Sequence, residues 1–186
     1  MVIRSKKQLY RYLFLYRSFL FHFVSFKTSL KDSTSKLIIN ALNIKNRYQR
    51  IYYVIDHLCD QIDDYYKDCN TCQFSNGKCI CHRTQHLDYQ NGCCRKCQYQ
   101  SSHGCTTKNF ACKMFYCSFV KDHVKVLKYS DLKLLYVLNP LQRFILKSDY
   151  FRTVDEVTKD LYYGPFIAAF RECFGIVFML FHHKKS

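Results

Sequence analysis

Ten of the twelve cysteines fall between Cys69 and Cys117, and this cluster constrains the fold more than any other feature of the chain. The surrounding segment, residues 68–120, lacks regular hydrophobic periodicity and contains many Asn, Ser, Gly and Gln residues. A stretch of about fifty such residues cannot hold itself together by apolar burial. Cross-links through the cysteines must therefore stabilise it.

The spacing of these cysteines favours metal binding, because two thiolates separated by two residues form one chelating hook for Zn²⁺. Cys69 and Cys72 make the first hook, and Cys79 with Cys81 or His82 completes a four-ligand set. A second hook and several trailing thiols make two or more sites possible. The full set of predicted metal ligands is Cys69, Cys72, Cys79, Cys81, His82, Cys93, Cys94, Cys97, Cys105, Cys112 and Cys117.

The irregular spacing and the neighbouring histidine favour zinc, with an iron–sulfur or redox cluster as the alternative and a disulfide-bonded surface protein as a further alternative. A catalytic zinc needs an acid or base beside it. Asp88 is the only acid between Cys69 and Cys117, and the two glutamates, Glu156 and Glu172, lie outside that stretch. We therefore expect a structural metal, and the sequence leans against an enzyme.

The run from Asn91 to Cys117 places the vicinal pair Cys93-Cys94 and Cys97 ahead of several trailing thiols. In this respect it resembles bacterial cysteine-cluster proteins described as zinc or iron chelators. The resemblance extends over Cys69 to Cys117, about a quarter of the chain. The resemblance implies metal binding and indicates no substrate.

The chain is strongly basic, with 29 Lys and Arg against 14 acids and a net charge of +15. Residues 1–50 hold eleven of the cations and one acid, Asp32. Such a balance predicts nucleic acid or an acidic protein as a partner, although the codon usage of an AT-rich genome also enriches lysine.

A second group of basic residues lies within the cysteine-rich segment, among aromatic residues. Basic side chains can contact phosphates and aromatic rings can stack on unpaired bases, so this mixture indicates single-stranded nucleic acid. The alternative is that these rings form a small core. The residues concerned are Arg83, Arg95, Lys96, Lys108 and Lys113, with Phe74, Tyr89, Tyr99, Phe110, Phe115 and Tyr116.

Helical periodicity flanks the cysteine-rich segment on both sides. The stripe is formed in the first helix by Leu9, Leu13, Tyr16, Leu20 and Phe23, and in the helix predicted over residues 44–66 by Tyr48, Ile51, Ile55, Leu58 and Ile62. A further helix is predicted after Ser33 as its N-cap, and another over residues 131–138 after Ser130. Pro140 favours a helix over residues 141–147, and a capping box at Thr153 and Glu156 begins a helix that extends to Tyr162. The last helix is predicted over residues 166–181.

These patterns predict a mainly α fold, a helical domain interrupted by a cysteine-rich, metal-stapled, loop-rich insert. The expected parts are an N-terminal helical segment (1–67), the insert (68–120) and a C-terminal helical segment (121–186) that packs with the first.

Aspartates gather late in the helix over residues 44–66, against the helix dipole, which predicts a basic neighbour.

No apolar run has the length of a membrane span, because Arg17 and His22 interrupt residues 13–24, and Arg171 and Glu172 interrupt residues 166–181. We therefore expect a cytoplasmic protein that does not bind a membrane surface. In a reducing cytosol the clustered thiols serve as ligands rather than disulfides. The two remaining cysteines, Cys59 and Cys173, lie on helical segments and are predicted to be core thiols.

Overall fold

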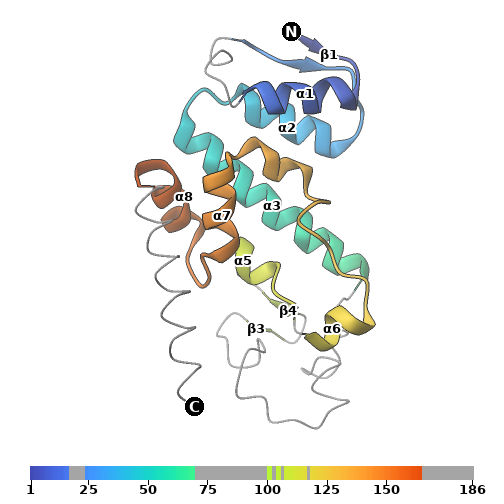
Figure 1. Cartoon of the computed structure of the whole chain (residues 1–186), viewed down its shortest axis with the longest axis vertical. Coiled ribbons are helices and arrows are strands. Elements are labelled where there is room, and N and C mark those ends of the chain that lie inside the picture. The colour runs from blue at the N-terminus through green and yellow to red at the C-terminus, as the bar shows by residue number, and fades with distance from the viewer. Residues whose placement is uncertain (17–23, 70–99, 102–103, 106, 117, 165–186) are drawn as a thin grey trace.

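The computed structural model describes residues 1–16, 24–69, 100–101, 104–105, 107–116 and 118–164, and this part of the chain is mainly helical (Figure 1). The mainly α prediction is confirmed. The helices are α1 (Lys6–Tyr16), α2 (Ser33–Asn43), α3 (Arg47–Cys69), α5 (Phe110–Lys113), α6 (Ser118–His123), the 3₁₀ helix η3 (Lys133–Val137), α7 (Pro140–Ser148) and α8 (Val154–Tyr163). The strands are β1 (Val2–Ile3), β2 (Lys27–Thr28), β3 (Gln100–Ser101) and β4 (Gly104–Cys105).

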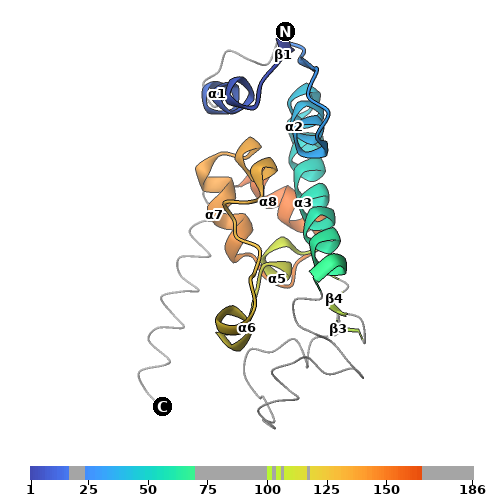
Figure 2. The same cartoon turned by 90° about the vertical axis from the view of Figure 1, so that its right-hand side faces the viewer.

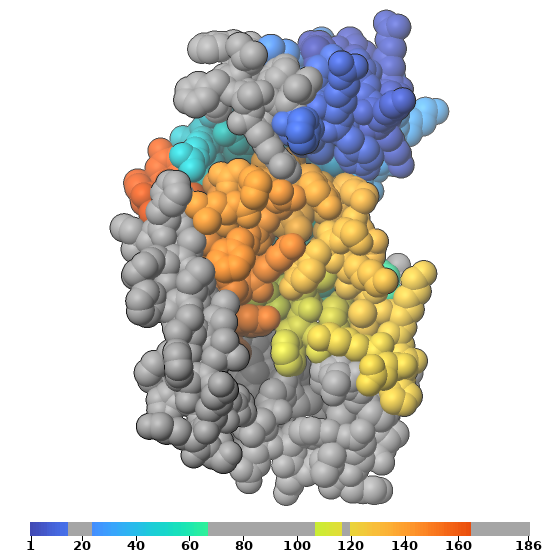
Figure 3. Space-filling view, viewed as in Figure 1, coloured from blue at the N-terminus to red at the C-terminus, as the bar shows by residue number. Residues whose placement is uncertain are grey.

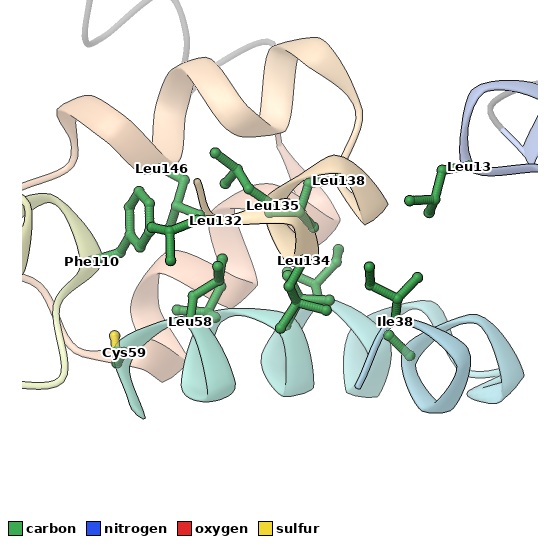
Figure 4. Packing of buried hydrophobic residues seen from close by; sticks show 14 of the residues in the cluster. Leu13, Ile38, Leu58, Cys59, Phe110, Leu132, Leu134, Leu135, Leu138 and Leu146 are labelled. Carbon is green, nitrogen blue, oxygen red and sulfur yellow. The ribbon is translucent and has the colours of Figure 1, made fainter. Parts of the chain in front are cut away.

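Helix α3 is the central element of the fold, and α2, α5, α8 and η3 pack against it. Four of the five positions of its predicted apolar stripe are buried, since Ile51, Ile55, Leu58 and Ile62 are each no more than 2% exposed. The fifth, Tyr48, is only partly buried. Figure 4 shows Leu58 among leucines of η3 and α7, with Ile38 of α2 farther along the same core. Segments before and after the cysteine-rich stretch therefore share one hydrophobic core.

The N-terminal strand β1 is held against β2, the strand that precedes α2. Strands β1 and β2 pair in parallel, with Val2 opposite Lys27. The Asn43 side chain fixes the approach to β2, because it accepts a hydrogen bond from the Phe26 N–H at 2.7 Å and donates one to the Phe26 carbonyl at 2.8 Å. Leu9 and Leu13 of α1 are buried, as their stripe predicts.

The helix caps follow local sequence, with one correction at the start of α2. Thr153 and Glu156 form the predicted capping box of α8, and Pro140 stands in the first turn of α7. The prediction of Ser33 as N-cap is wrong, because the Asp32 carboxylate accepts the hydrogen bond from the Ser35 N–H at 3.0 Å. Both residue types are good caps, and the carboxylate one residue earlier takes the position.

Two predicted helices differ in extent from those observed. The helix expected over residues 131–138 is the short 3₁₀ helix η3, which begins at Lys133 without a side-chain cap. The helix expected to begin at residue 44 begins at Arg47, because Ile44 is extended as the C-cap of α2. The Asn46 side chain instead accepts a hydrogen bond from the Gln49 N–H at 3.0 Å.

Several predicted features lie outside the described residues. These are the helix over residues 166–181 with Cys173, and the stripe positions Leu20 and Phe23. Among the helices that the structure describes, none combines the length and apolar character that crossing a membrane requires.

Candidate functional site

Three of the predicted metal ligands belong to described elements. Cys69 is the last residue of α3, Cys105 ends β4, and Cys112 lies in α5. The C-terminal end of α3 and strand β4 lie at the same end of the molecule, close to α5, in both views (Figures 1 and 2). The other predicted ligands, Cys72, Cys79, Cys81, His82, Cys93, Cys94, Cys97 and Cys117, lie outside the described residues.

The sulfur of Cys112 accepts a hydrogen bond from the Phe151 backbone N–H at 3.3 Å. Phe151 has a φ of 65°, in the left-handed region that is uncommon for a bulky residue. Backbone N–H groups directed at cysteine sulfur are among the interactions that tune metal-bound thiolates. Cys112 is therefore oriented by a loop that is distant in sequence.

Asn109 joins α5 to that loop. Its carboxamide oxygen accepts the Cys112 N–H at 2.8 Å, as the N-cap of α5. Its amide nitrogen donates to the carbonyls of Asp149 at 2.8 Å and Arg152 at 2.9 Å. Because Asn109 is only 2% exposed, water competes little for these bonds. Sequence reasoning missed this junction, although an Asn before an apolar turn is an N-cap signal.

Three aspartates of α3 pair with two lysines from the end of the cysteine-rich segment. Lys108 Nζ lies 3.2 Å from Asp56 Oδ1 and 2.5 Å from Asp60 Oδ1. Lys113 forms an ion pair with Asp63, and its side chain is only 2% exposed. The hydrogen bonds to Asp60 and Asp56 raise the pKa of Lys108 above its ordinary value. The predicted basic neighbour of these aspartates is confirmed.

These pairings change the interpretation of two of the basic residues around the cysteines. The predicted members that lie outside the described residues are Phe74, Arg83, Tyr89, Arg95, Lys96 and Tyr99. Lys108 and Lys113 were candidates for phosphate binding, and they pair instead with carboxylates of α3. Phe110 and Tyr116 are buried at 1% and 4% exposure, in agreement with the alternative that the rings form a core. Phe115 remains exposed and packs edge-on against Tyr150.

Cys59 is a core thiol, as predicted. It is fully buried on α3, and its thiol donates a hydrogen bond to the Lys108 carbonyl at 3.1 Å. Burial disfavours the thiolate and raises the pKa of Cys59 to about 12. It lies outside the predicted metal hooks and makes a cysteine control for them.

The raised pKa predicts that Cys59 resists alkylation in the folded protein. At pH 8 only about one thiol in ten thousand is ionised when its pKa is about 12, and the thiolate is the reacting species. Iodoacetamide treatment followed by peptide mass spectrometry should leave Cys59 unmodified until urea unfolds the chain. Rapid modification of Cys59 at low denaturant would show that α3 does not bury it.

A second group of potential ligands, Asp56, His57 and Asp60, lies together on α3. His57 Nδ1 is 3.7 Å from Asp56 Oδ2 and 3.9 Å from Asp60 Oδ2. The ammonium of Lys108 already contacts the Oδ1 atoms of both carboxylates, and its charge would repel a second cation at this place. We interpret this group as an ion-pair network. The spacing of these residues on a helix could have revealed it, but sequence reasoning considered only cysteine-rich hooks.

The N-terminal part of the molecule carries a basic surface. Nine of its cations are exposed, and Asp32 is the one acid among residues 1–50. Asp32 lies 3.8 Å from Lys6, and the Ser35 backbone N–H holds the pKa of Asp32 below its ordinary value. Residues of this stretch gather at one end of the molecule (Figure 3). We call them the basic lobe: Arg4, Lys6, Lys7, Arg11, Lys27, Lys31, Lys36, Lys45 and Arg47.

Comparison of the chain with protein-family models, with curated proteins and with solved structures finds no match.

Proposed function

We propose that this chain is a nucleic-acid-binding module whose cysteine-rich segment is held together by structural zinc. The observation that carries the proposal is the separation of charge. Asp56, Asp60 and Asp63 of α3 are paired with Lys108 and Lys113, whereas the nine exposed cations of the basic lobe come from a stretch, residues 1–50, that contains one acid. A surface of this kind attracts a polyanion and releases its counterions on binding.

The proposed zinc has a structural role. Cys69, Cys72 and Cys79 with Cys81 or His82 would hold one ion, and the Cys94–Cys97 hook would begin a second site. The bound zinc would supply the cross-links that a loop-rich segment lacks. The hydrogen bond from Phe151 to Cys112 supports a defined position for one sulfur beside the helical core. The anchors at Lys108, Asn109 and Lys113 support a rigid junction between that segment and α3.

The basic lobe should dominate binding to nucleic acid. We expect the triple variant Lys7→Gln, Arg11→Gln and Lys36→Gln to bind a fluorescent oligonucleotide roughly tenfold more weakly at moderate salt. Its plot of log K against log salt should be shallower by about 2, since each lost phosphate contact removes about 0.7 to 0.9 from the slope. Fluorescence anisotropy titrations at several KCl concentrations measure both quantities.

A matched control removes the same charge elsewhere. The variant Lys121→Gln, Lys125→Gln and Lys128→Gln also loses three exposed lysines, all outside the basic lobe. It should bind with nearly the affinity and salt slope of the original protein. Equal losses in both variants would show that net charge alone drives binding, and would contradict the assignment of the basic lobe as the interface.

A further inference from the structure

Aromatic side chains of α3 and α8 meet in a strip beside the basic lobe. The Tyr162 and Tyr163 ring centroids are 4.6 Å apart, those of Tyr48 and Tyr162 are 5.7 Å apart, and those of Tyr53 and His57 are 4.0 Å apart. Because α3 packs against α8, the Tyr48 ring of α3 meets the Tyr162 ring of α8. We call this set the tyrosine strip: Tyr48, Tyr52, Tyr53, His57, Tyr162 and Tyr163.

The α3 part of the tyrosine strip borders an open groove of about 310 Å³, whose lining is mostly apolar. Two rings are well exposed, with Tyr52 at 39% and Tyr163 at 77%. Contiguous exposed apolar surface is found at ligand-binding grooves and interaction sites. Flat rings with accessible faces suit a flat ligand.

The charges around the tyrosine strip favour an anionic ligand. Arg47 lies over the Tyr162 ring, 5.7 Å from its centroid, and both Arg47 and Lys45 are exposed members of the basic lobe. Asp56 also lines the groove, and the ammonium of Lys108, which Asp56 shares with Asp60, offsets part of its charge. Cations therefore stand at the end of the groove where α3 begins.

We propose that the tyrosine strip binds single-stranded nucleic acid, with unpaired bases stacked on its rings and adjacent phosphates at Lys45 and Arg47. This inference rests on the proposed function and extends it, because it selects the class of nucleic acid. Aromatic rings that stack on bases, together with cations that contact phosphates, are the components of single-strand recognition. A duplex keeps its base faces stacked inside the helix, so it can use the basic lobe but not the tyrosine strip.

The test compares Tyr52→Ala with Tyr52→Phe, using one 15-residue sequence as fluorescein-labelled single-stranded RNA, single-stranded DNA and duplex. The alanine variant should bind either single strand about 5- to 100-fold more weakly, because one stacked base is lost. Its salt slope should stay unchanged, since no phosphate contact is removed. The phenylalanine variant and all duplex affinities should change by less than about twofold.

Tyr163→Ala provides a second variant, since its ring is 77% exposed and its removal leaves the core intact. Circular dichroism melting curves confirm that each variant is folded. If both alanine variants bind single strands as tightly as the original protein, the tyrosine strip is not the site, and the role of the basic lobe stands. Equal losses for single strands and duplex also overturn the inference. A protein that binds none of the oligonucleotides overturns both the tyrosine strip and the proposed function.

Discussion

Replacing Cys72 by serine should reduce the zinc content by about one ion per chain and open the cysteine-rich segment to proteases. Serine does not supply the thiolate that the Cys69–Cys72 hook requires. Structural zinc contributes an apparent binding free energy of about 10 to 16 kcal/mol, which in such a segment is folding free energy. Metal analysis and timed trypsin digestion followed by mass spectrometry measure the two effects.

The control for this variant is Cys59→Ala, which also removes one cysteine. Cys59 is fully buried among the apolar residues of α3 and lies outside the hooks. Its loss should lower stability by about 1 kcal/mol and leave the zinc content unchanged. The helical core should survive Cys72→Ser, because residues such as Ile55 and Leu134 bury one another. Full zinc content and undiminished protease resistance in Cys72→Ser would contradict the predicted ligand set.

Replacing Asp63 by alanine should lower the free energy of unfolding by about 3 kcal/mol. Lys113 would then keep a positive charge on a side chain that is 2% exposed, without the carboxylate that pairs with it. Asp63 itself is 34% exposed, so we expect the lower end of the range for breaking a buried ion pair. Urea unfolding followed by circular dichroism measures the change.

Two further variants separate the ion pair from other effects. Asp122→Ala removes an exposed aspartate of α6 and should change the stability by no more than about 0.5 kcal/mol. Adding Lys113→Met to Asp63→Ala removes the stranded charge and should recover most of the loss. A double variant as unstable as Asp63→Ala would show that the unpaired charge of Lys113 does not cause the loss of stability.

Local features of this fold could be predicted because each depends on residues within one or two helical turns. The stripe from Ile51 to Ile62 predicted the buried side of α3, and Thr153 with Glu156 predicted the start of α8. The N-cap of α2 was misassigned by one residue, because Asp32 and Ser33 are both strong caps and only the backbone geometry chooses between them.

Contacts between distant segments could not be predicted in the same way. Composition showed that the aspartates of α3 need cations, but not that Lys108 and Lys113 supply them. Asn109 holds a loop that lies 40 residues away. The tyrosine strip draws its rings from both α3 and α8, and no pattern in a single helix places Tyr48 beside Tyr162. Periodicity does not carry this information, because it describes one element at a time.

The metal content of the purified protein, measured together with its visible absorption spectrum, tests the central claim most directly. We predict a colourless protein with at least one tightly bound zinc ion per chain. A strong chelator should remove the zinc, and the cysteine-rich segment should then lose its resistance to proteases. Stoichiometric iron with a visible absorption band would instead indicate an iron–sulfur cluster. A metal-free protein whose melting curve and helicity do not respond to the chelator would contradict the account.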